Sequence, residues 1–201
     1  MSTRMLGAMT GRPRDPAVDD AIRRATIQLT RELGYRGLSM EGIAARSGVS
    51  KQTVYRRFRS KGEVVLDALI GYAVAKLPTP DTGSLHGDLT ELLTSTFRAV
   101  QGVPGSLNRA LAAEALQDEE FARRAWDDLL AVRREAARTI LVRGRLRGEV
   151  HHPDDELLLD LAYGPMWYRL LFGVEALTDD YARSLAAAIC EVAARPAPQG
   201  C

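Results

Sequence analysis

Apolar residues recur along this chain at steps of three and four, the spacing of one face of an amphipathic α-helix. The first stripe begins after Asp15 and ends at Gly34, where a glycine can terminate the helix. No segment alternates with a period of two, so no strand of consequence is expected. The pattern therefore predicts an all-α protein, with two further stripes formed by Leu85, Leu89, Leu93, Phe97 and Val100, and by Phe121, Ala125, Leu129, Val132, Ala136 and Ile140.

The last two predicted helices span about residues 154–172 and 178–194, and both begin with acidic residues, which suit the positive end of a helix. The first has apolar residues on more than one face, so it should be buried on two sides. One side is the subunit's own core. The other is predicted to meet a second chain, giving a four-helix interface with two-fold symmetry; the alternative is a monomer that buries both helices internally. Pro165 predicts a kink near Gly164.

Composition limits the class of protein. The chain has 201 residues, of which 46% are hydrophobic and 26% charged, as in one or two ordinary globular domains. Two cysteines cannot form a disulfide framework, and the sequence has neither an apolar run of membrane-spanning length nor the apolar region of a signal peptide. We therefore expect a cytoplasmic protein with no membrane association.

The formal net charge of +1 conceals an uneven distribution. Residues 1–64 hold 13 Lys and Arg against 6 Asp and Glu, a net charge of +7, whereas the remainder holds 14 against 20, a net charge of −6. A basic N-terminal third favours a polyanionic partner for that part of the chain. An uneven solvated surface without a function is the alternative.

The stretch from Leu38 to Lys61 predicts a helix, a tight turn and a second helix. Ser39 and Ser50 can each cap a short helix, and Gly48 between them permits the left-handed backbone of a turn. Residues 60–63, Ser-Lys-Gly-Glu, form a capping box that begins the next helix. The two short helices should pack through Ile43, Val49, Val54 and Phe58.

The second short helix, from Lys51 to about Phe58, has more polar side chains than stability requires: Lys51, Gln52, Thr53, Tyr55, Arg56 and Arg57. Such a helix fits the DNA major groove, where Gln and Arg can read base edges while Thr, Tyr and Lys bind phosphate. Lys61 and the free amides of the following helix offer another phosphate site. A plain two-helix turn with solvated charges is the alternative, but the coincidence with the basic third favours DNA binding.

Several short motifs carry a specific resemblance: Gly34-Tyr35, Ser39, Ile43-Ala44, Ser47-Gly48-Val49-Ser50, Thr53-Val54-Tyr55, Phe58 and Ser60-Lys61. With them, residues from about 15 to 70 resemble the DNA-binding domain of the tetracycline-repressor family of bacterial transcriptional regulators. The resemblance implies an all-helical homodimer of roughly nine helices, in which three N-terminal helices bind an operator and a larger C-terminal domain dimerises and binds a small effector.

The resemblance also assigns roles to individual positions. The family's phosphate contacts fall on Ser39, Thr53, Tyr55 and Lys61, and its base or groove contacts on Lys51, Gln52 and Arg56. Position 62 departs from the family pattern, because Gly62 replaces an acidic or small helix-forming residue and should weaken the local helix slightly.

The segment Gly11-Arg12-Pro13-Arg14 resembles the short basic arm of many family members. Arginines in an extended strand can enter a narrow A·T-rich minor groove, so Arg12 and Arg14 are predicted to bind DNA; a floppy terminus with chance arginines is the alternative. The predicted organisation is a flexible basic arm (1–14), a helix-turn-helix DNA-binding domain (15–62), an effector-binding and dimerisation domain (63–195) and a tail (196–201).

The C-terminal region is less informative. Residues 142–150 and 163–173 look like one subgroup of the family's C-terminal domains, which does not identify a ligand. A kinked apolar helix could leave an apolar pocket. The candidates to line it are Phe97, Trp126, Tyr163, Met166 and Trp167, and for each of them packed core or a dimer contact is the alternative.

Other chemistry is not indicated. His151 and His152 are adjacent and lack a third metal ligand at a workable spacing, and Cys190 is expected to pack as a small apolar residue. No phosphate-cradling glycine loop or nucleophile elbow occurs, so we expect neither a cofactor nor an enzyme. The sequence predicts a homodimeric regulator, most simply a repressor that a small effector releases from a near-palindromic operator; a protein that recruits another protein without an effector is the alternative.

Overall fold

The computed structural model describes residues 15–76 and 79–196, so Arg12 and Arg14 of the predicted arm lie outside the described residues. Every regular element in this part is helical, which confirms the all-α prediction. The elements are α1 (Pro16–Gly37), α2 (Met40–Ser47), α3 (Lys51–Arg57), α4 (Lys61–Lys76), α5 (Leu85–Ala99), α6 (Val103–Ala115), α7 (Glu119–Ala125), the π-helical segment η1 (Trp126–Leu130), α8 (Ala131–Leu146), α9 (Asp155–Phe172) and α10 (Asp179–Ala193). Because α7, η1 and α8 follow one another without a break, the described residues form nine helices.

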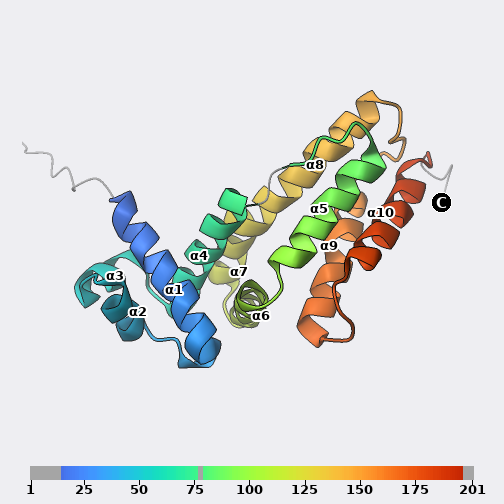
Figure 1. The fold of residues 1–201 in the computed structure, drawn as a ribbon. Helices are drawn as coiled ribbons and strands as arrows, with labels where there is room; N and C mark the ends of the chain where they lie inside the picture. Colours follow the sequence, from blue (N-terminus) through green and yellow to red (C-terminus); the bar gives the residue numbers. More distant parts are fainter. Residues whose placement is uncertain (1–14, 77–78, 197–201) are drawn as a thin grey trace, which may run out of the picture.

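Helices α1–α3 gather at one end of the molecule, and α5, α8, α9 and α10 form a bundle at the other, with α4, α6 and α7 between them (Figure 1). The apolar stripes predicted from the sequence become α1, α5 and the continuous helix that ends at Leu146. Gly34, with φ 68°, ends the regular part of α1 as predicted. Helix α6 was not predicted, although Pro104 in its first turn is typical of a helix start.

Two apolar cores support this arrangement. The first lies among α1–α4 and also includes Leu107 and Leu111 of α6, together with Phe121, Ala125 and Leu129. The N-terminal helices are therefore packed against residues on both sides of position 62, the predicted domain boundary. The second core joins α5, α8, α9 and α10 around Leu92, Phe97, Ile140, Leu158 and Ile189.

The segment η1 changes the turn of the long helix. The N–H of Ala131 donates to the carbonyl of Trp126, five residues back, as in a π-helix. In a regular α-helix, residues four apart drift around the axis by about 40° per step, and a π-turn reduces this drift. Phe121 and Leu129 can therefore pack in the first core while Ala137 and Leu141, on the same helix, pack in the second.

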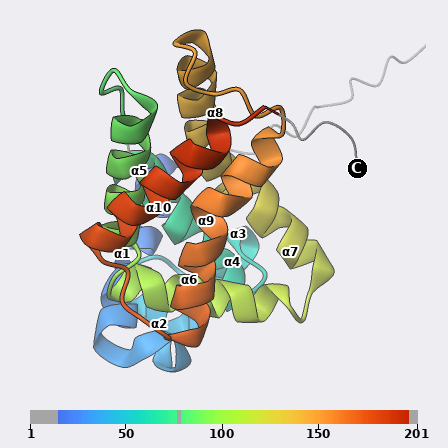
Figure 2. The ribbon, with the colours of Figure 1, turned by 90° about the vertical axis from the view of Figure 1, so that its right-hand side faces the viewer.

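Helix α9 is continuous across Pro165. It lies beside α10, and the two helices form one surface of the bundle (Figure 2). In the part of the chain that the structure describes, no helix combines the length and the apolar character needed to cross a bilayer.

Candidate nucleic-acid interface and effector cavity

The turn between α2 and α3 is built by two serine caps and one glycine, as the sequence predicts. Ser39 Oγ accepts a hydrogen bond from the N–H of Gly42 (3.1 Å), and Ser50 Oγ accepts one from the N–H of Thr53 (3.2 Å). Ser50 Oγ also donates to Thr53 Oγ1 (2.9 Å). Gly48 ends α2 with φ 70°, a left-handed conformation that costs a glycine little.

Helix α3 is anchored by Val54, which is fully buried, and directs most of its polar side chains outward. Lys51, Gln52 and Arg56 are exposed, and Gln52 and Arg56 lie one turn apart on the same face. Tyr55 is 48% exposed, and its hydroxyl donates to Glu41 Oε1 (2.7 Å). This hydrogen bond lowers the pKa of Glu41 below its usual value. The exposed face of α3 is therefore polar, and the Tyr55–Glu41 hydrogen bond joins it to α2.

Arg57 differs from its neighbours on α3. Its guanidinium forms an ion pair with Asp19 of α1, and the two side chains are only 11% and 13% exposed. The prediction that Arg57 is in excess of what stability requires is wrong, because its ion pair joins α3 to α1. A second contact joins α2 to α1, because Arg46 makes hydrogen bonds of 2.8 and 2.7 Å to the two carboxylate oxygens of Glu32.

The first turn of α4 is tied to α1 through Lys61. Its Nζ donates to the carbonyl of Tyr35 (3.1 Å) and lies 4.1 Å from the centre of the Tyr35 ring. Ser60 Oγ accepts from the N–H of Glu63 (3.3 Å), as the predicted capping box requires. The return bond differs, because the Glu63 carboxylate accepts from the N–H of Arg59 (2.7 Å) instead of that of Ser60.

Helix α6 contacts the same turn through Glu114. Gly62 is buried, and a Cβ atom added there would lie 3.0 Å from Cδ and Oε1 of Glu114. The other oxygen, Oε2, accepts a hydrogen bond from the hydroxyl of Tyr35 (3.1 Å). Burial, and then the charge of Glu114, raise the pKa of Tyr35 to about 12, so the hydroxyl remains a donor. The departure from the family pattern at Gly62 therefore has a structural reason: it leaves room for the carboxylate of α6.

A cavity of ≈ 60 Å³, measured as the space that the centre of a water molecule can occupy, lies between α4, α5, α6, η1, α8 and α9. Of the five predicted lining residues, Tyr163, Met166 and Trp167 form part of its wall. Phe97 does not, because it is fully buried in the second core and stacks on Tyr181 with a ring separation of 5.8 Å. Trp126 is 46% exposed and lies under the guanidinium of Arg134.

The sequence missed most of the wall. Its other members are Leu69, Tyr72, Thr96, Ala99, Val100, Pro104, Asn108, Leu129, Leu130 and Arg133. Thr96 directly precedes Phe97, so the prediction for α5 was off by one residue, about 100° around the helix axis. Arg133 offered no signal, because it is one of many arginines on an amphipathic helix.

Comparison with known proteins identifies the family. The model of "Bacterial regulatory proteins, tetR family" matches residues 22–68, and that of "Tetracyclin repressor-like, C-terminal domain" matches residues 79–189. The chain belongs to the tetR family. The HTH-type transcriptional regulator YdeS of Bacillus subtilis (strain 168) is 34% identical over 176 residues, which cover 87% of this chain and 89% of YdeS.

Two further members of the tetR family support this assignment. The DNA-binding transcriptional repressor TetR of Mycobacteroides abscessus is 30% identical over 162 residues, covering 76% of this chain and 82% of that protein. The crystal structure of the TetR family regulator SCO0332 has a TM-score of 0.76 at 28% identity, and covers 87% of this chain and 97% of that one. Regulators of the tetR family bind DNA and act as dimers, so this protein is a DNA-binding transcriptional regulator.

The two adjacent histidines, considered above as metal ligands, and Cys190 have structural roles in this tetR-family fold. The N–H groups of His151 and His152 both donate to the carbonyl of Ala193, at 2.7 and 2.9 Å, and join the loop before α9 to the end of α10. Among the described residues no group of three potential metal ligands occurs. Cys190 is half-buried, and burial raises the pKa of its thiol to about 11.

Proposed function

We propose that this regulator is a cytoplasmic repressor that binds a near-palindromic operator as a homodimer and is released by a small effector bound in the cavity. The observation that carries the DNA-binding part is the outward polar face of α3 on a helix held by Val54 and by the Arg57–Asp19 pair. A rigid helix with exposed polar side chains can read base edges without first becoming ordered.

The contacts divide into two groups. Gln52 and Arg56, together with Lys51, read base edges or the groove. Tyr55 and Lys61 bind phosphate, assisted by Ser39, Ser50 and Thr53 near the helix ends. Tyr55 must share or release Glu41 to do so, and Lys61 is already oriented by Tyr35. With Arg12 and Arg14 in the minor groove, each subunit would contact both grooves.

The dimer forms through α9 and α10. Leu157, Leu161, Gly164, Tyr168 and Leu171 follow one another at steps of four and three along α9, the spacing of a helix–helix seam. Leu157, Tyr168 and Leu171 are 41%, 59% and 43% exposed, which is unusual for a solvated helix face. Because α9 and α10 lie side by side at the surface (Figure 2), two copies can pack as a four-helix interface.

The effector part of the proposal is supported by the position of α6. Pro104 and Asn108 line the cavity, whereas Glu114, at the other end of the same helix, contacts Tyr35 and Gly62 beside Lys61. A ligand that fits only one position of α6 would bias the orientation of the DNA-binding end by its differential affinity for the two states. The separation of the two α3 helices, about 34–36 Å on an operator, would then change.

Fluorescence anisotropy with duplex DNA from the region beside the protein's own gene tests the proposal, with scrambled DNA as control and two salt concentrations. We expect one dimer per site and affinity that falls with salt. Gln52→Ala should relax preference at one or two base pairs by about 1–3 kcal/mol each, whereas Lys61→Ala should weaken binding to all sequences alike. Equal affinity for operators selected from random DNA and for scrambled DNA would contradict the proposal.

A further inference from the structure

The cavity has a chemically asymmetric wall. Most of its lining is aliphatic or aromatic, including Leu69, Val100, Leu129, Met166 and Trp167. The lining residues, as far as the structure describes the chain, include one side chain with a full charge, Arg133, and no Asp or Glu. A cavity of this kind favours an apolar ligand body and a negatively charged group at one end.

Arg133 is held in place at the wall. Its Nη2 donates to Thr96 Oγ1 (3.0 Å), and Thr96 itself is a buried member of the same wall. The main-chain carbonyl of Arg133 accepts a hydrogen bond from the hydroxyl of Tyr163 (2.7 Å), a third lining residue. Two residues of the cavity wall, one on α5 and one on α9, therefore fix the position of the guanidinium-bearing turn of α8.

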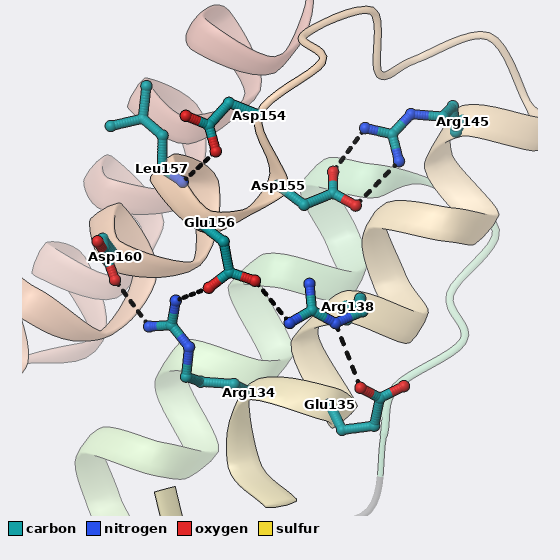
Figure 3. Close-up of polar contacts among 9 residues, drawn as sticks. All are labelled: Arg134, Glu135, Arg138, Arg145, Asp154, Asp155, Glu156, Leu157 and Asp160. Carbon is teal, nitrogen blue, oxygen red and sulfur yellow. Dashed lines mark hydrogen bonds and ion pairs between the residues drawn. The ribbon is translucent and has the colours of Figure 1, made fainter. Parts of the chain in front are cut away.

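The acidic side chains of α9 form ion pairs with the arginines that follow Arg133 on α8. Arg134 pairs with Glu156 (2.5 Å) and Asp160 (2.7 Å), and Arg138 pairs with Glu156 (2.8 Å) (Figure 3). These carboxylates lie on the outer side of the α8–α9 contact and are 60% and 69% exposed. Consecutive arginines thus have different surroundings: Arg134 joins α8 to α9, and Arg133 is part of the cavity wall.

We propose that the effector is a small monoanion with an apolar body, such as an aromatic carboxylate. Its carboxylate binds Arg133, and its ring packs against Met166, Trp167 and Leu129. This inference rests on the proposed function, because it identifies the ligand class of the same cavity. The present volume of ≈ 60 Å³ holds only a few water molecules, so a ring-sized ligand also displaces side chains of the wall. That displacement provides the differential affinity that release from DNA requires.

Isothermal titration calorimetry of the full chain tests the charge preference with three probes that share one ring system, 1-naphthoate, 1-naphthamide and 1-naphthylmethylamine, with benzoate as a smaller acid. We expect an acid to bind at least about tenfold more tightly than the matching amide, because a hydrogen bond between a carboxylate and a guanidinium is stronger than one between a neutral amide and a guanidinium. The amine should bind most weakly. Equal affinity for acid and amide, tighter binding of the amine, or no binding of either acid to protein that binds its operator would overturn the ligand class.

Variants at Arg133 locate the preference. Arg133→Met should abolish the difference between acid and amide, Arg133→Lys should retain most of it, and Arg123→Met, at an exposed position on α7, should leave it unchanged. An acid preference that survives Arg133→Met would overturn the assignment. Operator binding measured on the same preparations separates this inference from the proposed function: failure to bind any operator would refute the latter while the acid preference stands.

Discussion

Replacing Gly62 with alanine tests whether Glu114 is the reason for a glycine in the first turn of α4. Alanine in a helix is favoured over glycine by about 0.5–1 kcal/mol, mainly because it restricts the unfolded chain. The added Cβ would lie 3.0 Å from Cδ and Oε1 of Glu114, tighter than most Cβ contacts in proteins, so the carboxylate must shift. The carboxylate belongs to a flexible side chain and can move away, but it then loses the hydrogen bond from the Tyr35 hydroxyl (3.1 Å).

That lost hydrogen bond involves a charged acceptor and a half-buried donor, so its loss costs about 1.5 kcal/mol, the lower end of the usual range. Gly62→Ala should therefore lower the free energy of unfolding by about 0.5–1 kcal/mol in the wild-type protein. In a Glu114→Ala background the obstacle is absent, and the same substitution should raise the free energy of unfolding by about 0.5–1 kcal/mol. The sign of the effect reverses between the two backgrounds.

Urea unfolding followed by circular dichroism measures all four proteins of this cycle, at one protomer concentration because dimerisation contributes to stability. The expected coupling between positions 62 and 114 is about 1.5 kcal/mol. Tyr35→Phe provides a control: with no hydroxyl to lose, Gly62→Ala should no longer destabilise the protein. Additive effects of the two substitutions, within about 0.5 kcal/mol, would refute the explanation for Gly62.

Three further results are expected. Leu171→Asp should give monomers in sedimentation equilibrium, whereas Leu146→Asp, at a leucine 84% exposed elsewhere, should not; a dimeric Leu171→Asp variant would exclude this interface. Arg57→Met should destabilise the protein by about 2–4 kcal/mol in urea, because it removes one charge of a mostly buried ion pair, and an unchanged midpoint would contradict this. In a variant that lacks the C-terminal cysteine, the Cys190 thiol of the folded protein should react with a disulfide reagent at pH 8 about 100-fold more slowly than that of the unfolded protein. The rate for the folded protein should rise as the pH approaches 11. Equal rates for the folded and the unfolded protein would show an accessible thiolate.

Much of this architecture could be predicted because its signals are local. Ser39 and Ser50 cap the two short helices by accepting from N–H groups three positions on, Gly48 forms the turn between them, and the apolar stripes specify α1, α5 and the continuous helix α7–α8. The exposed positions Gln52 and Arg56 follow from the same periodicity, since Val54 must face the core. Such features require no knowledge of distant parts of the chain.

The features that sequence reasoning missed depend on residues far apart in the chain. Arg57 is indistinguishable from Arg56 until Asp19, 38 positions earlier, is brought beside it. The role of Gly62 depends on Glu114, and the role of Arg133 depends on Thr96 and Tyr163. In each case tertiary packing, and not the local pattern, decides which of several similar side chains is used.

The π-helical segment η1 gives the long helix α7–α8 one point at which its length can change. A π-turn holds one residue more than an α-turn, so deleting one residue between Trp126 and Leu130 could restore ordinary α-helical bonding and leave the later residues on nearly the same faces. Deleting one residue from the first turns of α8 instead would rotate every later residue by about 100° about the axis, and Ile140 would leave the second core. A single deletion should therefore be less harmful in η1 than in the regular helix that follows it.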